Sequence, residues 1–106
     1  MSKIRPRHHD RERVLRDVTF RVLPAGYPWR GSTIDLSPSG AKLFSEQALQ
    51  VGDLLELAWS GGNATLKLTG RVAHVHVEVD GTWAGVQFVT PIDSRAFESL
   101  CAKRGD

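Results

Sequence analysis

The chain has 106 residues, of which 41% are hydrophobic and 25% are charged, and its formal net charge is +2. A chain of this length is long enough for one soluble domain and too short for two. No apolar run is long enough to span a membrane. Its one cysteine, Cys101, excludes an internal disulfide and is typical of the reducing cytoplasm, where we expect the protein.

The basic residues are concentrated at the N-terminus. The first 16 residues contain six basic and two acidic side chains, whereas the remaining 90 contain eight basic and ten acidic ones. Residues 1–12 have no apolar periodicity, so we expect a flexible basic arm over 1–12 and one domain over 13–106. Such an arm indicates an anionic partner, with a solvated tail that aids solubility as the alternative.

Six segments with the period-two alternation of β-strands follow the arm. The fifth segment is long for one strand, and we interpret Gly70 inside it as a bulge or a sharp bend. Turns rich in glycine, proline, asparagine and aspartate separate the segments. The predicted strands cover about 13–23, 29–36, 41–45, 52–59, 64–79 and 82–89.

A helix is predicted at the C-terminal end of the chain. Asp93 or Ser94 can cap a helix over about 95–103, after the break at Pro91. Six short strands with close turns and one terminal helix predict a mainly β fold. The expected architecture is a six-stranded antiparallel β-barrel with a C-terminal α-helix, because closure removes exposed strand edges.

Two short motifs lie in order along the chain. Arg7 and Arg11 form an RxxxR pattern, and Asp35, Ser37 and Gly40 form a DxSxxG pattern. The second pattern has the composition of a β-turn, in which glycine suits the fourth position and also lets a ligand or the arm approach the backbone closely. Taken alone, it is therefore also explained as an ordinary turn.

These motifs, followed by the segment 85–88 (GVQF), resemble the bacterial PilZ domain over about residues 7–100. The resemblance implies a six-stranded barrel of Greek-key type that binds cyclic di-GMP, a bacterial second messenger, and acts in motility, biofilm or virulence control. It also implies the ligand-binding residues. These are the two arginines of RxxxR and the three fixed positions of DxSxxG: Arg7, Arg11, Asp35, Ser37 and Gly40.

A second register of the arginine motif is equally compatible with the sequence. Counted from the first strand and from Asp35, Arg13 occupies the second arginine position and His9 the first, so Arg13 is also a candidate ligand-binding residue. Arginine suits this ligand because its planar guanidinium forms paired hydrogen bonds to phosphate oxygens and to the guanine edge. The second register favours weaker binding, or none.

Three functions follow from this reading. The first is a cyclic di-GMP receptor whose ligand-ordered arm signals to a partner protein that the sequence does not identify. The second is a PilZ-like protein–protein adaptor that does not bind nucleotide. The third, a small nucleic-acid-binding barrel, is disfavoured because the body of the chain is net acidic.

Other candidate sites have simpler explanations. His74, His76 and Glu78 share one strand face, which suits a metal, but such a row is more often solvent-facing, so we expect neither metal nor cofactor. No nucleophile–base set or phosphate loop is recognisable, and we expect no enzymatic activity. The three tryptophans fall on predicted strands, where packing is the usual role and stacking on a guanine is the alternative. They are Trp29, Trp59 and Trp83.

Overall fold

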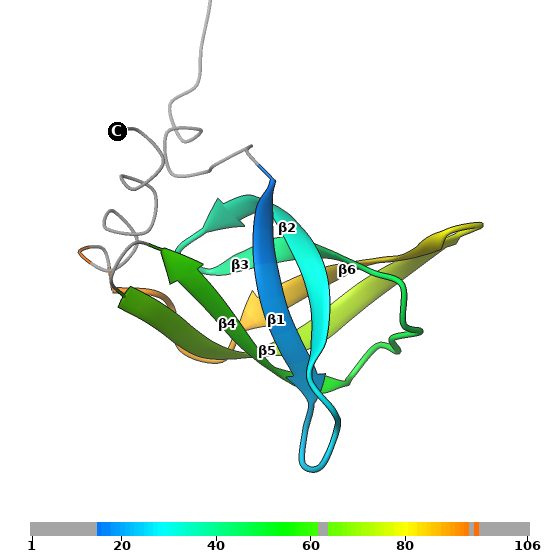
Figure 1. The fold of residues 1–106 in the computed structure, drawn as a ribbon, viewed down its shortest axis with the longest axis horizontal. Coiled ribbons are helices and arrows are strands. Elements are labelled where there is room, and N and C mark those ends of the chain that lie inside the picture. The colour runs from blue at the N-terminus through cyan, green and yellow to red at the C-terminus, as the bar shows by residue number, and fades with distance from the viewer. Residues whose placement is uncertain (1–14, 62–63, 94, 96–106) are drawn as a thin grey trace, which may run out of the picture.

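The structure is a computed structural model that describes residues 15–61, 64–93 and 95 of the chain. Within these residues, six strands form one closed barrel in which neighbouring strands are antiparallel (Figure 1). The strands are β1 (Arg16–Val22), β2 (Trp29–Ser37), β3 (Gly40–Ser45), β4 (Leu54–Gly61), β5 (Ala64–Glu78) and β6 (Gly81–Phe88). The mainly β fold and the six-stranded antiparallel barrel are therefore confirmed.

The strands follow the order β1-β2-β3-β6-β5-β4 around the barrel, and β4 closes it by pairing with β1. The connection over residues 46–53 therefore leads from β3 to the opposite side of the ring. The predicted helix over 95–103 lies outside the described residues apart from Arg95, as does the arm over 1–12, so both stay predictions. In the described part of the chain, no helix is long and apolar enough to cross a membrane.

Alternate strand residues point into the barrel and form its apolar core. Phe20, Leu43 and Leu57 are fully buried there, and each such side chain stabilises the fold by roughly 1.5–3 kcal/mol. Trp59 is also buried, and its Nε1 donates a hydrogen bond of 2.9 Å to Oγ1 of Thr33. This bond satisfies a polar group that burial would otherwise destabilise. The interior is thus filled by side chains, which leaves the outer surface for ligands.

The strand register shifts at two places, one in β2 and one in β5. The ladder between β2 and β3 shifts between Ile34 and Ser37, and the ladder between β5 and β6 shifts between Val72 and His74. A bulge of this kind places one extra residue on one strand and turns the following side chains to a different direction. Both bulges lie on strands that flank the β3–β6 pair.

The bulge of β5 lies at Ala73, whereas at Gly70 the sequence suggested a bulge or a sharp bend. Gly70 keeps a regular register, pairing with Leu55 of β4 on one side and with Phe88 of β6 on the other. The long strand passes at this point from one neighbour to the next. A Cβ on Gly70 would collide with the side chain of Val86, so the glycine is required by close packing.

Candidate functional site

Asp35 lies in the bulge of β2 with a left-handed backbone, at φ 57°. This conformation is costly for most residues with a Cβ, and aspartate tolerates it better because its short polar side chain bonds locally. The next residue, Leu36, is buried at 1% exposure, whereas Asp35 is half-buried and its Oδ1 has no accessible surface. The bulge therefore holds a carboxylate at the outer wall without disturbing the core.

Ser37 ends β2 and organises the turn that leads into β3. Its Oγ lies 3.3 Å from the carbonyl oxygen of Gly40, to which it donates, and 3.4 Å from the backbone N–H of Ser39. The turn is also fastened to the end of the barrel. The amide of Phe88 donates to Ser39 at 2.9 Å, and the amide of Ile92 donates to Pro38 at 2.7 Å. The turn is therefore held by the end of β6 and by the segment that follows it.

Gly40 begins β3 and pairs with Gln87 of β6. A Cβ at this position would collide with the backbone oxygen of Val86, so a larger residue would force two strands apart. The sequence suggested that Gly40 lets a ligand or the arm approach the backbone closely. In the structure it is strand β6 that makes a close approach at this position, and the glycine therefore has a packing role.

The three motif residues lie together on an open groove of about 350 Å³ on the outside of the barrel. Asp35, Ser37 and Gly40 all line it. The groove also has polar side chains that sequence reasoning did not place there. They are Lys42 of β3, His74 of β5 and Gln87 of β6.

Only some of the residues that line this groove can be predicted from the sequence. Lys42 follows Gly40 by two residues on one strand and so shares its face, which the period of a strand makes predictable. His74 and Gln87 come from strands far along the chain, and their placement depends on the pairings of Gly85 with His74 and of Gly40 with Gln87. No local pattern reveals those pairings.

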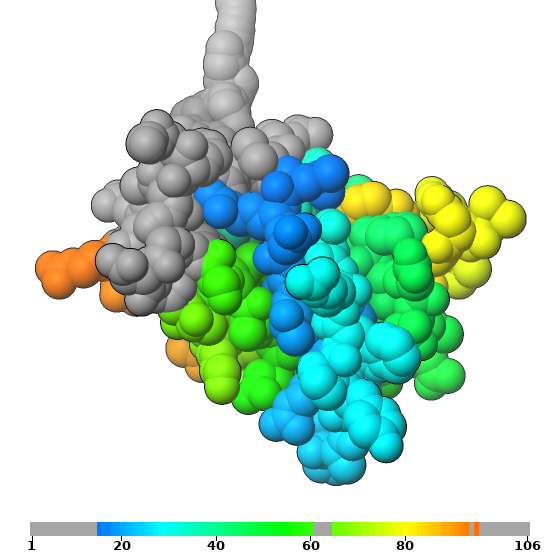
Figure 2. All heavy atoms as spheres, viewed as in Figure 1, coloured from blue at the N-terminus to red at the C-terminus, as the bar shows by residue number. Residues whose placement is uncertain are grey.

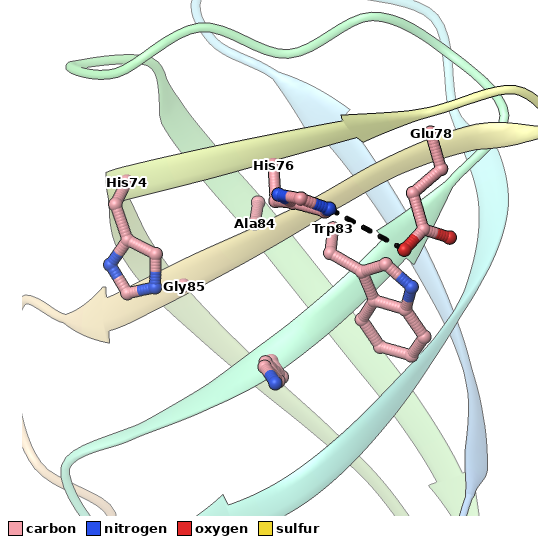
Figure 3. A pocket seen from close by; sticks show the side chains of 7 residues that line it. His74, His76, Glu78, Trp83, Ala84 and Gly85 are labelled. Carbon is pink, nitrogen blue, oxygen red and sulfur yellow. Dashed lines mark ion pairs between the residues drawn. The ribbon is translucent and has the colours of Figure 1, made fainter.

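A second depression of about 320 Å³ adjoins the groove and shares Lys42, His74 and Gly85 with it (Figure 3). Trp83 forms part of its wall, and Nζ of Lys42 lies 5.7 Å from the centre of the Trp83 ring. A cation at this distance from an indole is attracted by its π-electrons. The depression therefore offers a flat aromatic surface beside a positive charge.

The row of His74, His76 and Glu78 lies on one face of β5, as predicted, and all three line this depression. Nε2 of His76 is 3.6 Å from Oε2 of Glu78. Among residues 15–61, 64–93 and 95, no three histidine, cysteine, aspartate or glutamate side chains are close enough together to hold a metal ion. The row is thus an exposed polar surface next to the groove.

The three tryptophans have different places in the barrel. Trp59 is buried in the core, which removes it as a surface for stacking. Trp29 is 43% exposed and begins β2, six residues or roughly 20 Å along the strand from Asp35. Trp83 alone among them lines the second depression. It packs against Phe44 with 5.1 Å between ring centres.

The arginine candidates Arg7, Arg11 and Arg13 lie outside the described residues, so the choice between the two registers stays open. The structure does place the start of β1. Arg16 pairs with Thr33, and Oγ1 of Thr33 donates to the carbonyl oxygen of Arg16 at 3.3 Å. Because Thr33 precedes the carboxylate of the groove by two residues, β1 begins beside that part of β2.

Comparison with known protein families shows which family the chain resembles. The family model of the PilZ domain matches residues 6–102, nearly the whole chain. The match includes both motifs, the groove and all six strands. The PilZ domain is a binding domain that generally takes cyclic di-GMP, and it is not an enzymatic family. No curated protein matches the chain.

Proposed function

Because the chain belongs to the PilZ domain family, we propose that it is a receptor for cyclic di-GMP. The ligand occupies the outer groove between the turn of Asp35, Ser37 and Gly40 and the arginines of the N-terminal arm. One observation supports this most directly. A carboxylate is held by a strained bulge at an open groove, beside the point where the strand that follows the arm begins.

The groove suits the chemistry of this ligand, which has two phosphates and two guanines. The carboxylate of Asp35 accepts hydrogen bonds from N1–H and N2–H₂ of a guanine, or it orients an arginine. Lys42 and the arm arginines supply positive charge for the phosphates. Trp83, in the adjoining depression, offers a ring face on which a base can stack.

The arm is long enough for its role. Arg13 precedes Arg16 by three residues and Arg7 precedes it by nine, so their α-carbons lie at most about 10 and 32 Å from the start of β1. Ordering the arm costs about 1–2 kcal/mol for each residue fixed. Charge-assisted bonds of about 1.5–3 kcal/mol each offset that cost. Binding therefore couples to folding of the arm, and a partner protein recognises the changed surface.

The test is a calorimetric titration of the full chain with cyclic di-GMP. Wild type is compared with Arg7→Ala, Arg11→Ala and Arg13→Ala, and Arg30→Ala is the control because it removes an arginine near the far end of β2. We expect each variant that lacks a ligand-contacting arginine to bind cyclic di-GMP tenfold to a hundredfold more weakly, and the control to keep wild-type affinity. Unchanged binding in all three arm variants would refute the arm's role.

A PilZ-like adaptor that binds no nucleotide is the second candidate. The observation that favours it is the register in which His9 occupies the first arginine position of the motif and Arg13 the second. The same titration separates the two functions, with GTP and a short single-stranded oligonucleotide as competing ligands. No saturable heat with any of the three supports the adaptor. A response to the oligonucleotide that weakens steeply with salt supports a nucleic-acid-binding barrel.

A further inference from the structure

β5 pairs with a different strand in each half, and only Gly70 and Arg71 have a strand partner on both sides. Residues 64–71 pair with β4, and the strand then pairs with β6 as far as Glu78. On the other side, Gly52 and Asp53 bond to the backbone of Val72 at 2.8 and 2.9 Å. Beyond Val72, no strand in the described part of the chain pairs with that edge. The β5–β6 hairpin extends outward there (Figures 1 and 2).

This edge has little of the protection that is usual for an exposed strand, since the bulge at Ala73 lies before it and Glu78 is the one acidic residue of 74–79. Natural edge strands carry lysine or proline, and residues 74–79 contain neither. Instead Val77 is 72% exposed and Val79 is fully exposed at the hairpin end. Every second residue of an antiparallel edge also presents its N–H and C=O outward. The edge therefore offers both backbone bonds and apolar side chains to another strand.

The side chains of this edge alternate in a way that complements the same segment run in the opposite direction. Val75 and Val77 lie on one face, and His74, His76 and Glu78 lie on the other. In an antiparallel pair centred on His76, Val75 faces Val77 of the second copy and His74 faces Glu78 of the second copy. Apolar groups thus meet apolar groups, and each carboxylate meets an imidazole.

We propose that the edge formed by residues 74–78 is a homodimer interface, in which β5 pairs antiparallel with β5 of a second copy about His76. The partner is a second copy of this chain, because the segment run in the opposite direction places valine against valine on one face and histidine against glutamate on the other. The contact is short, and a complex of this size is weak and depends on concentration. The proposal does not depend on nucleotide binding, so it is tested without ligand.

Sedimentation of the full chain from about 10 µM to 1 mM tests association in this weak range. We expect a reversible dimer, and slower exchange of amide hydrogens in residues 74–78 as the concentration rises. Val77→Lys should weaken the dimer by about tenfold, because it replaces two cross-strand valine contacts with charges. The matched control is Val51→Lys, which makes the same change at a residue of similar exposure, 62%, in the β3–β4 connection.

A charge exchange tests the register. Glu78→Lys should weaken the dimer, because it removes the carboxylate that faces His74 of the second copy, and Glu78→Lys combined with His74→Glu should restore an opposite-charge pair. A chain that stays monomeric at the highest concentration would overturn the proposal. Equal loss in Val77→Lys and Val51→Lys would do the same, as would a double variant that associates no better than Glu78→Lys.

Discussion

Two walls of the same barrel differ in regularity. Where β1 pairs with β4, and where β4 pairs with β5, the ladders run without a register shift. On the wall of the groove, β2 and β5 each contain a bulge, and β3 and β6 lie between them. In a regular wall, side chains point inward and outward in strict alternation, so the position of a residue in the strand fixes its direction. The bulges let the groove wall present additional outward side chains while the core stays filled.

The groove wall also contains two glycines with different neighbours. A Cβ on Gly40 would meet the backbone oxygen of Val86, which belongs to a paired strand and cannot move alone. A Cβ on Gly85 would meet the imidazole ring of His74, which lies at the exposed end of a flexible side chain. The first glycine thus permits strand packing, and the second leaves space for a side chain beside the groove.

The largest expected effect is on stability, from Gly40→Ala. The added methyl group forces β3 and β6 apart, and we expect a loss of about 2–3 kcal/mol in the free energy of unfolding. Urea denaturation measures it. Ser39→Ala, in the same turn, is the control and should cost under about 0.5 kcal/mol because its side chain is exposed. A Gly40→Ala protein as stable as this control would contradict the packing role.

Replacements of Asp35 separate its backbone role from its carboxylate. Asp35→Val should destabilise the fold by about 1–3 kcal/mol, because a branched side chain is strained at φ 57°. Asp35→Gly relieves the strain and should stay near wild-type stability. Both remove the carboxylate, so both should lose affinity for cyclic di-GMP by tenfold or more in calorimetry. Full affinity in a well-folded Asp35→Gly protein would exclude the carboxylate as a ligand contact.

The two bulges also show how far the sequence predicts this wall. The bulge of β2 coincides with a readable motif, since the left-handed position is occupied by Asp35, a residue type that tolerates it. The bulge of β5 is at Ala73, and alanine has no preference for a bulge. The sequence suggested a bulge or a sharp bend at Gly70 instead. Strand periods are local and were predicted. The shift in β5 depends on its pairing with β6, which no single segment determines.

The candidate site was likewise predictable only where its residues are close in sequence. Asp35, Ser37 and Gly40 are close in sequence, and their proximity in space follows from one turn. The side chains of His74 and Gln87 reach the groove only through the register of β3, β6 and β5. Reasoning from residue types identified the turn and not the groove around it, because cross-strand neighbours are set by the whole barrel.

A smaller effect is expected from Gly85→Ala, the counterpart of Gly40→Ala on the next strand. The imidazole of His74 can rotate away from a methyl group, so the free energy of unfolding should change by less than about 1 kcal/mol. The chemical shifts of His74 should move, and affinity for cyclic di-GMP should fall by less than in the Asp35 variants. A destabilisation as large as that of Gly40→Ala would show that the two glycines have the same role.

The smallest effect is expected on the regular wall. Nε of Arg21 on β1 donates to Oε1 of Glu56 on β4 at 2.8 Å, and this bond lowers the pKa of Glu56 below its usual 4.5. A lowered pKa means that the pair stabilises the fold above pH 4.5, and that this contribution disappears as the pH falls through the lowered value. Glu56→Gln should therefore be slightly less stable than wild type at pH 7, with a difference that vanishes in acid.

Urea denaturation at several pH values measures this difference, and Glu46→Gln controls for the removal of one exposed negative charge. Salt should reduce the effect, because the Arg21 and Glu56 side chains are 39% and 34% exposed. Cyclic di-GMP should bind Glu56→Gln as it binds wild type, since the pair lies outside the groove residues. A fall in affinity like that of the Asp35 variants would mean that the ligand contacts the regular wall, and the distinction between the two walls would fail.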